Sequence, residues 1–431
     1  MTVGLIYLPH QYLIDPEAQP PMGLMYLASV LEQNNIPVKL FNLSSLTDEQ
    51  AIEELTECEL FGISVTSLEL LQANDFAKKI KNKFPNSKII LGGPGTLCPE
   101  YVNFDHIDSV LKGEGEITIL DVVKDVQNGQ LKQHYQGKIT KNLDDIPFPA
   151  RHLLNTQGGH IFANRRTYDK TFSMEFKGHG STAILTSRGC PYNCIYCSAK
   201  ALNGKMRYRS PQNVYDEIKY VYDMYKIKQF RISDEMFTAN PKRVLEICEL
   251  IKPLGLVWRI SCRVKPLTKE LLQIMKNAGC VEVSFGIESF DNNVLKGLNK
   301  KATAEDNAKA LIMAKEVGLM TRVLFMIRTP YQTKDTVRKN IEWLKKVPYD
   351  TIACTSFVPL PGTPVWEKPD KYGIEILNKN LNEYNFYFYG SEGKNELKDI
   401  IKIKNRSLKE FNKESEYFRL WIEKQGKTNK G

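Results

Sequence analysis

The sequence lacks a long hydrophobic run, and this absence excludes an ordinary membrane-spanning helix. No stretch of about 18 consecutive apolar residues occurs among the 431 residues, and a helix needs such a stretch to cross a bilayer. The N-terminus also lacks the basic start and the long apolar core of a signal peptide. Instead, residues 3–8 have the pattern of a buried strand. We expect no membrane span and no signal peptide.

Cysteine is scarce, and charge of one sign is only mildly in excess. The chain has nine cysteines, of which only three lie close together, and this usage suits a reducing compartment, so we expect a cytoplasmic protein. The formal net charge is +9. Because the lysines are spread through all segments, we interpret this charge as a solvated surface, not as a site for an acidic partner. We expect no binding to nucleic acid.

The pattern of residues 1–125 predicts a doubly wound, Rossmann-like α/β domain. Apolar strands expected at 3–8, 38–41, 60–66, 89–93 and 108–111 alternate with helices, which is typical of a parallel sheet. Ligands of such sheets lie outside the carboxyl ends of the strands. The loops there, at 64–67, 92–96 and 113–116, are small and rich in glycine. They allow the backbone to approach a bulky planar or phosphate-bearing ligand.

The rest of the chain predicts a second architecture. Residues 126–181 are expected to form a linker or lid, because 142–149 are rich in turn residues and include two prolines. Residues 182–367 contain six expected strands, at 183–186, 230–233, 257–260, 281–286, 323–327 and 352–357. With the helices between them they predict a partial (β/α)6 barrel of the TIM type, whose active residues belong at the carboxyl ends of the strands. Residues 368–431 predict a mainly helical segment.

Three cysteines follow the first barrel strand at the spacing C-x3-C-x2-C. Cys190, Cys194 and Cys197 can hold three irons of a cubic 4Fe–4S cluster and leave the fourth iron open. A structural zinc site would need a fourth ligand nearby, which the sequence does not offer, and a disulfide would leave one thiol over. Gly189 and Pro191 favour a wrapped loop over three unrelated buried cysteines.

This motif, with Tyr196 before its last cysteine, resembles the signature of the radical S-adenosylmethionine (SAM) superfamily. Residues 286–289 resemble the family element G-x-E-S, and residues 233–237 resemble D-D-x-F with glutamate for the second acid. The resemblance implies that SAM binds the open iron. It implies cofactor contacts from Tyr196, Asp234, Arg263, Gly286, Glu288 and Ser289.

Two of these residues have alternative interpretations. Glu288 is either a ligand of the SAM ribose or a structural carboxylate that pairs with Arg322 or Arg263. Asp234 either contacts SAM or organises the mouth of the barrel.

The first 125 residues resemble the cobalamin-binding domain that precedes the barrel in many radical SAM enzymes. The implied cobalamin contacts are Ser64, Thr66, Ser67, Gly92, Gly93, Gly95, Gly113, Glu114 and Gly115. The motif D-x-H-x-x-G, whose histidine coordinates cobalt in such domains, is absent, and none of the six histidines stands in that pattern. Cobalamin would therefore have no histidine from this motif below cobalt. The alternative is a degenerate domain that only packs on its neighbour.

One loop departs from the family pattern. After the fifth barrel strand the family usually has G-x-P-G-E-T, whereas this chain has Arg328 and Tyr331 in place of the two glycines. We therefore expect no SAM contact from this loop. Arg328 and Tyr331 are either substrate contacts, in which Arg328 supplies a charge and Tyr331 a stacking surface, or the result of sequence drift in a loop.

The resemblance implies an enzyme with a 4Fe–4S cluster, SAM and cobalamin. Such an enzyme cleaves SAM to a 5′-deoxyadenosyl radical and methylates an unactivated carbon of a small molecule through methylcobalamin. Its electrons come from an external donor of the flavodoxin or ferredoxin type. The alternative is a dehydration, ring contraction or cyclisation on the same architecture. A methylthiotransferase is disfavoured because only Cys58 and Cys98 precede the barrel, and a non-enzymatic iron–sulfur module leaves the open iron unexplained.

Overall fold

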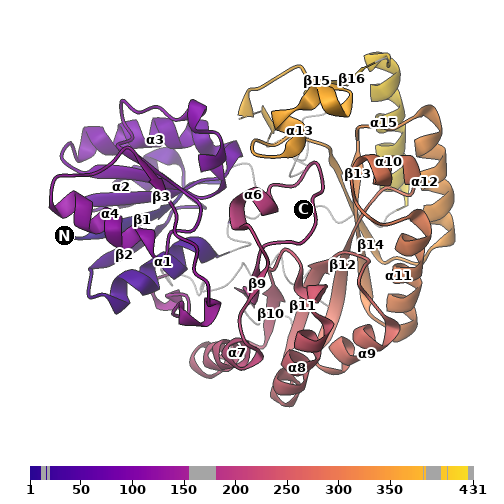
Figure 1. The fold of residues 1–431 in the computed structure, drawn as a ribbon, viewed down its shortest axis with the longest axis horizontal. Coiled ribbons are helices and arrows are strands. Elements are labelled where there is room, and N and C mark those ends of the chain that lie inside the picture. The colour runs from indigo at the N-terminus through magenta and orange to yellow at the C-terminus, as the bar shows by residue number, and fades with distance from the viewer. Residues whose placement is uncertain are drawn as a thin grey trace. The chain divides into compact units, whose positions relative to one another are not determined.

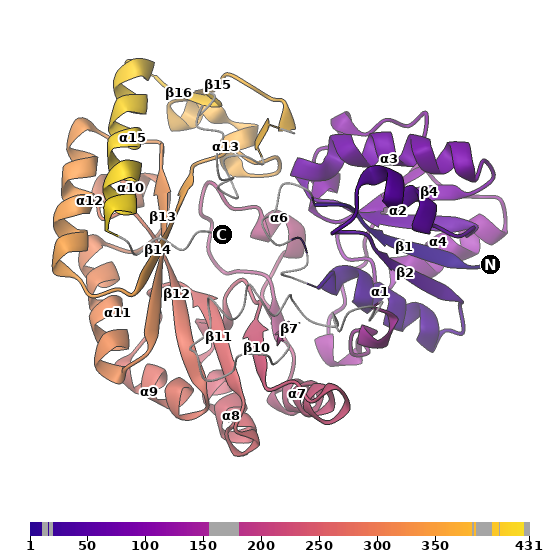
Figure 2. The ribbon, with the colours of Figure 1, turned by 180° about the vertical axis from the view of Figure 1, so that it is seen from behind.

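The protein folds into two compact α/β units. The computed structural model describes residues 1–10, 16, 20–154, 181–381, 383–384, 399–404 and 406–425. The first unit is built mainly from residues 1–154, and the second mainly from residues 181–379 and 399–425 (Figures 1 and 2). Within these described ranges no helix is both long and apolar enough to span a bilayer.

The first unit is a parallel sheet with helices on both faces, as the sequence predicts. Its strands are β1 (Val3–Tyr7), β2 (Val38–Asn42), β3 (Leu60–Ser64), β4 (Lys88–Gly92), β5 (Ser109–Lys112) and β6 (His134–Gln136), in the order β2-β1-β3-β4-β5-β6. Its helices are α1 (Met22–Gln33), α2 (Asp48–Glu54), α3 (Leu70–Lys83) and α4 (Thr118–Gln127). Helix α1 contacts α4, and α2 contacts α3 (Figure 1).

The core of this unit follows from the apolar faces of its helices. Leu24 and Leu31 of α1 join Leu5 of β1 and Ile119 of α4 in one buried cluster. Helix α2 begins at a capping box, in which Thr47 and the side chain of Gln50 accept each other's backbone N–H. This reciprocal bonding satisfies two N–H groups that a helix start otherwise leaves unpaired.

The strand order reverses at β1, which lies between β2 and β3. At such a switch point the connections on either side run in opposite directions and leave a crevice at the carboxyl ends of the strands. The loops after β1, β3 and β4 therefore form the expected ligand edge of the first unit. Strand β6 was not foreseen: it lies within the segment predicted as a linker and pairs in parallel with β5. Residues 155–180 of that segment lie outside the described residues.

The second unit is a parallel six-stranded sheet of consecutive βα units. Its strands are β7 (Ser181–Ile184), β10 (Gln229–Ile232), β11 (Val257–Cys262), β12 (Cys280–Glu288), β13 (Met320–Ile327) and β14 (Thr351–Ser356), in chain order across the sheet. Its larger helices are α7 (Pro211–Tyr225), α8 (Pro241–Ile251), α9 (Lys269–Asn277), α11 (Ala304–Val317) and α12 (Lys334–Lys346). Figure 2 shows these helices along one side of the curved sheet. Among the described strands, β7 and β14 do not pair, so the barrel is partial.

The strands of the barrel are packed on one face and partly open on the other. Residues of β13 alternate between half-buried and buried along its whole length, as expected where one face lies under helices and the other lines the barrel. On the packed side Trp258 is fully buried, stacks on Phe230 at 6.2 Å between ring centroids, and donates its indole N–H to the carbonyl of Ala278.

The C-terminal part is helical but begins with strands. Helix α13 (Pro364–Glu367) is followed by β15 (Ile374–Ile376), which pairs antiparallel with β16 (Ile401–Ile403). Helix α15 (Leu408–Lys424) then packs on the barrel, with Phe418 5.1 Å from Phe325 of β13 between ring centroids. The strand pair was not foreseen, because each strand has only three residues and the two lie far apart in the sequence.

Candidate functional site

The cysteine loop begins at the carboxyl end of β7 and is anchored there by a buried carboxylate. Asp234, which follows β10, accepts hydrogen bonds from the backbone N–H of Thr186 at 2.6 Å, the hydroxyl of Thr186 at 2.5 Å and the hydroxyl of Ser187 at 2.6 Å. Burial raises the pKa of Asp234, and the bonds from Ser187 and Thr186 oppose that rise. Both carboxylate oxygens are therefore occupied by the loop, which agrees with the organising role considered for Asp234.

Two buried arginines donate hydrogen bonds to backbone carbonyl groups at the start of the cysteine loop. Arg243 of α8 donates to the carbonyl of Thr186 at 2.6 Å, and Arg209 donates to the carbonyl of Leu185 at 2.7 Å. Arg209 also forms an ion pair with Glu217 of α7. Sequence reasoning missed these residues, because Arg243 lies in an ordinary amphipathic helix and Arg209 in the short connection between β9 and α7.

The loop then turns back at a glycine that the geometry requires. Strand β8 (Ser187–Arg188) pairs antiparallel with β9 (Arg207–Tyr208), and helix α6 (Ala199–Asn203) lies between them in the chain. Gly189 has φ +89°, and a side chain there would place Cβ 2.8 Å from the carbonyl oxygen of Lys205. Only glycine adopts this conformation without strain and leaves room for that approach.

The three cysteines lie on this wrapped loop, and a guanidinium reaches one of them. Cys194 is buried, Cys190 is half-buried and Cys197 is exposed. Nη1 of Arg263, at the end of β11, lies 3.1 Å from Sγ of Cys194, and the same guanidinium stacks 3.8 Å from the ring centroid of Tyr192. Burial raises the pKa of Cys190, while the N–H of Tyr192 and the charge of Arg263 oppose the rise.

These residues fit a cluster better than a single metal ion. Within the part of the chain that the structure describes, no three histidine, cysteine or acidic side chains converge on one ion. A cubic cluster does not require that convergence, because each thiolate binds a different iron. In addition, Nε of Arg263 is buried and has no hydrogen-bond partner within the described ranges. A buried donor of this kind fits an acceptor group of a ligand beside the cysteines.

Beside the cysteine loop, Glu288 lies in a cluster of buried polar side chains. Glu288 Oε1 is 3.1 Å from the hydroxyl of Tyr196 and 2.7 Å from Nζ of Lys300. The partners expected for a purely structural Glu288, Arg322 and Arg263, are therefore not its partners. The charges nearest Arg322 are Glu282 and Arg259, and Arg263 lies against Cys194. The structure thus brings Tyr196, Gly286 and Glu288 together and adds Lys300, which was not foreseen, while their contact with SAM stays a prediction.

Ser289 lies apart from this group. It is fully buried, its hydroxyl donates to Asn340 of α12 at 3.1 Å, and it accepts from the N–H of Asp291 at 3.0 Å. These bonds fix the turn after β12. The role of Ser289 as a SAM contact stays a prediction that these bonds do not support.

The loop after β13 is the one that departs from the family pattern. The two residues that stand in place of the family's glycines adopt the backbone conformation of glycine. Arg328 has φ +61° and Tyr331 has φ +66°, which is the left-handed region that glycine normally occupies. Arg328 is buried and pairs with Asp399 at 2.9 Å, so it binds the C-terminal part of the chain. The idea that Arg328 is a charge for the substrate finds no support in this geometry.

In the first unit, the loops after β3 and β4 are closely fitted to each other. Thr66 donates its N–H to Glu69 at 2.8 Å, and Oε1 of the buried Glu69 lies 3.1 Å from Nδ1 of His10, which follows β1. A Cβ at Gly93 would lie 2.7 Å from the carbonyl oxygen of Val65, and Gly93 has φ +86°. A Cβ at Gly95 would lie 2.7 Å from the Val65 side chain and 2.8 Å from the carbonyl oxygen of Thr66.

The glycines of the loop after β5 are also explained by packing within the protein. A Cβ at Gly115 would lie 2.9 Å from Leu27 of α1, and Gly113 has φ +97°. Glu114 is buried and accepts from the N–H of Thr140 at 3.2 Å. Among the predicted cobalamin contacts, Gly92 differs from the other glycines, because nothing lies within 4 Å of the Cβ that a side chain would add. A side chain at Gly92 would therefore enter open space, whereas Cβ atoms at Gly93, Gly95 and Gly115 would meet other parts of the protein.

This difference gives a test of the ligand edge. We expect Gly92→Leu to block cobalamin binding by filling the open space, while changing the free energy of unfolding by less than about 1 kcal/mol. Gly95→Ala is the contrasting variant, because its methyl group meets Val65 and the backbone of Thr66. Such overpacking is expected to lower stability by about 1–3 kcal/mol.

The measurement is the cobalamin retained after reconstitution and desalting, read from its visible absorption, together with the midpoint of thermal unfolding. Full retention of cobalamin by a folded Gly92→Leu protein would contradict the assignment of this edge.

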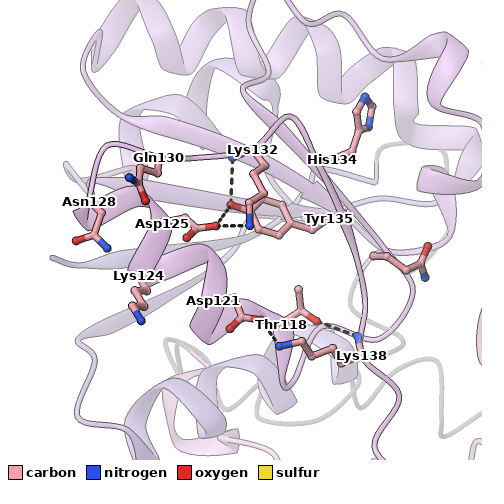
Figure 3. A pocket seen from close by; sticks show the side chains of 11 residues that line it. Thr118, Asp121, Lys124, Asp125, Asn128, Gln130, Lys132, His134, Tyr135 and Lys138 are labelled. Atoms are coloured by element: carbon pink, nitrogen blue, oxygen red, sulfur yellow. Dashed lines mark hydrogen bonds and ion pairs between the residues drawn. The ribbon is translucent and has the colours of Figure 1, made fainter.

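An open pocket of about 560 Å³ lies elsewhere on the first unit, around α4 and β6. Its side chains satisfy one another: Lys138 pairs with Asp121 at 2.6 Å, and Asp125 accepts from the hydroxyl of Tyr135 at 2.8 Å and pairs with Lys132 (Figure 3). None of the predicted site residues lines it. The pocket is therefore not part of the candidate site.

Comparison with known proteins identifies both units. The family model of the radical SAM superfamily matches residues 184–344, and that of the B12 binding domain matches residues 17–123. An uncharacterized methyltransferase of Pyrococcus horikoshii is 31% identical over 394 residues, which cover 85% of this chain and 81% of that protein. The anaerobic magnesium-protoporphyrin IX monomethyl ester cyclase of Rubrivivax gelatinosus is 25% identical, with 85% of this chain and 69% of that protein covered.

A solved structure has the same fold over nearly the whole chain. It is the radical SAM methyltransferase TsrM from Kitasatospora setae with cobalamin and a [4Fe-4S] cluster bound, with a TM-score of 0.71 and 16% identity, covering 97% of this chain and 90% of that one. The chain therefore belongs to the radical SAM superfamily, in the branch that carries a B12 binding domain. It is an enzyme whose cofactors are a 4Fe–4S cluster, SAM and cobalamin.

Proposed function

We propose that this enzyme methylates a carbon that is not nucleophilic in a small molecule. The observation that carries the proposal is the pairing, on one chain, of the cysteine loop at a barrel mouth with an open ligand edge at Gly92. The chemistry supplied by the bound groups is reductive cleavage of SAM to a 5′-deoxyadenosyl radical and delivery of a methyl group from cobalamin. The name of the Pyrococcus relative, a methyltransferase, supports the same reaction.

The residues of the barrel mouth have separable roles in this proposal. Cys190, Cys194 and Cys197 would hold three irons of the cluster and would leave the fourth iron open for SAM. Arg263 lies against Cys194 and has a buried Nε that can donate to the SAM carboxylate. Glu288 accepts hydrogen bonds from the ribose hydroxyls, for which an ionised carboxylate is a strong acceptor.

The residues of the first unit position the other reactant. The loops at 64–67 and 92–96 are held together by their own hydrogen bonds, so the edge is formed before a ligand arrives. His10 is buried and engaged by Glu69, and it does not stand in a D-x-H-x-x-G motif. We therefore infer that cobalamin binds here without a histidine from that motif below cobalt.

Two further inferences concern the surroundings of the enzyme. All nine cysteines are free, which supports a cytoplasmic location because thiols persist in a reducing compartment. Cleavage of SAM consumes an electron for each radical. We propose an external donor of the flavodoxin or ferredoxin type, which can be tested by comparing turnover with either protein against turnover with dithionite.

The stoichiometry of the products tests methyl transfer. Because one SAM is spent as methyl donor and one as radical source, a methyltransferase should give S-adenosylhomocysteine and 5′-deoxyadenosine in about equal amounts per turnover. Both products can be quantified by liquid chromatography and mass spectrometry with candidate substrates. We expect both to rise together with the methylated product.

A second candidate function is a radical reaction without methyl transfer, favoured by the similarity to the Rubrivivax cyclase. In that case 5′-deoxyadenosine accumulates with substrate while S-adenosylhomocysteine stays at background. This result would replace methyl transfer by cyclisation, dehydration or ring contraction on the same site.

A further inference from the structure

Lys300 is a buried lysine that none of the predicted roles includes. It follows α10 (Asn292–Gly297) and is 4% exposed. Its two neighbours in the chain, Asn299 and Lys301, have φ +55° and +57°, so the backbone makes a sharp local turn at this point. A lysine is almost never fully buried without a partner, because removing its charge from water is costly. The partners of Lys300 therefore indicate its role.

The partners come from two elements of the proposed SAM site. Nζ of Lys300 lies 2.7 Å from Oε1 of Glu288 and 3.4 Å from the hydroxyl of Tyr196, which itself donates to Glu288 at 3.1 Å. One carboxylate oxygen of Glu288 is thus held by two donors, while no donor to its second oxygen occurs among the described residues.

The glycine of the G-x-E-S element is explained by this ion pair. A Cβ at Gly286 would lie 2.9 Å from Oε1 of Glu288 and 2.9 Å from Nζ of Lys300. The pairing of β12 with β13 is irregular between Gly286 and Glu288, and Glu288 has φ +63°. The backbone is therefore turned so that Glu288 meets the lysine, and a non-glycine residue at 286 would collide with the pair.

The turn that carries Lys300 also holds the cysteine loop. The carbonyl of Leu298 accepts from the N–H of Ile195 at 3.2 Å, and the side chain of Asn299 donates to the carbonyl of Asn193 at 2.7 Å. Ile195 and Asn193 flank Cys194 in the sequence. The turn that carries the buried Lys300 is thus hydrogen-bonded to both chain neighbours of Cys194, in a part of the protein where charges are poorly screened by water.

We propose that Lys300 is a positioning residue that aims the ionised Glu288 at SAM and balances its negative charge beside the cluster. The proposal rests on the assignment of the three cysteines to the cluster. Without the lysine, the negative charge of Glu288 would be uncompensated and would oppose the addition of an electron to the nearby cluster. Without Glu288, the uncompensated positive charge of Lys300 would favour the addition of an electron to the cluster. The two single removals should therefore shift the reduction potential of the cluster in opposite directions.

The experiment uses the reconstituted full-length enzyme and the variants Lys300→Met, Lys300→Arg, Glu288→Gln and the double variant Lys300→Met/Glu288→Gln. Lys301→Met is the matched control, because it removes an adjacent lysine that is exposed. The reduction potential of the cluster is measured at pH 8 by redox titration with electron paramagnetic resonance. The dissociation constant of SAM is measured from the change that SAM causes in that spectrum, and iron content is determined in parallel.

We expect Lys300→Met to shift the potential to more negative values and Glu288→Gln to shift it to more positive values. The double variant, which loses a neutral pair, should return close to the potential of the natural enzyme. SAM affinity should fall at least about tenfold in Lys300→Met, in Glu288→Gln and in the double variant. We expect this size because each variant weakens or removes one charge-assisted hydrogen bond to SAM. Lys300→Arg should recover most of the affinity, and Lys301→Met should change neither quantity.

Equal potentials and SAM affinities in Lys300→Met and the natural enzyme would overturn the proposal. Loss of iron from Lys300→Met and Lys300→Arg alike would also overturn it, since the lysine would then only hold the loop. The double variant removes the carboxylate that Lys300→Met leaves unpaired, so comparing its potential with that of Glu288→Gln reports the effect of Lys300 even where Lys300→Met folds poorly. A natural enzyme that binds no iron would overturn the cysteine assignment itself, and the iron content separates that failure from the others.

Discussion

Replacement of any one of Cys190, Cys194 or Cys197 by alanine is expected to abolish SAM cleavage while leaving the chain folded. Each thiolate binds a different iron, so the loss of one leaves an incomplete cluster that cannot deliver an electron to SAM. The chain stays folded because Asp234, Arg243 and the β8–β9 pair fix the ends of the loop independently of the metal. The measurement is 5′-deoxyadenosine formed with dithionite as reductant, with iron content and thermal unfolding measured on the same samples.

The matched control for these variants is Cys354→Ala. Cys354 is a free, half-buried cysteine in β14, outside the motif, and its replacement should leave the iron content and the rate of SAM cleavage unchanged. Release of 5′-deoxyadenosine at the natural rate by any of the three motif variants would refute the cluster assignment.

The strand positions of both units could be predicted because their period and composition are unambiguous. Strand β3 is a short, mostly apolar run, and the longer β12 alternates apolar residues with Glu282 and Ser284. Both patterns differ from the period of the helices between the strands. Strand β6 could not be predicted in the same way. It has only three residues, with His134 and Gln136 exposed, and it becomes a strand because β5 offers an unpaired edge.

The residues of the site were predictable only where a short motif contains them. The three cysteines and Glu288 belong to such motifs. Lys300 reaches the site from the turn after α10, and Arg209 reaches it from the end of β9. Nothing in the sequence adjacent to either residue distinguishes it from a surface residue. Their burial is a property of the tertiary structure. Position alone therefore did not reveal that Lys300 is the partner of Glu288, in place of the arginines that sequence reasoning considered.

The glycine-rich loops show how one residue type serves two purposes. The sequence analysis interpreted the glycines at 92, 93, 95, 113 and 115 as room for a ligand. The structure gives three of them a reason within the protein itself, by positive φ at Gly93 and Gly113 and by the close backbone of Thr66 at Gly95. A glycine needed for loop packing and a glycine needed for ligand approach look identical in a sequence, because both are defined by space that the chain creates only on folding.

Apart from the cysteines themselves, Asp234 is expected to be the residue on which the cysteine loop depends most. Its carboxylate accepts all three donors at the start of the loop, and Thr186 and Ser187, which supply them, are fully buried. Water cannot replace the carboxylate there without opening the barrel mouth. Truncation to alanine would leave one buried N–H and two buried hydroxyls without an acceptor, each at a cost of about 1–3 kcal/mol.

We therefore expect Asp234→Ala to lower the free energy of unfolding by about 3–5 kcal/mol, as for other buried charged groups that lose their partners, and to reduce the iron bound after reconstitution to a small fraction. Asp234→Asn has the same shape and retains one acceptor oxygen, so its losses should be intermediate. The matched control is Asp223→Ala, which removes a half-exposed aspartate of α7 paired only with Lys219 on the surface and should change stability by less than about 1 kcal/mol. Denaturant unfolding and iron analysis of the three variants decide the question. If Asp234→Ala binds as much iron as the natural enzyme, the loop does not depend on this anchor, and Asp234 becomes available again for the direct contact with SAM that the D-D-x-F resemblance implies.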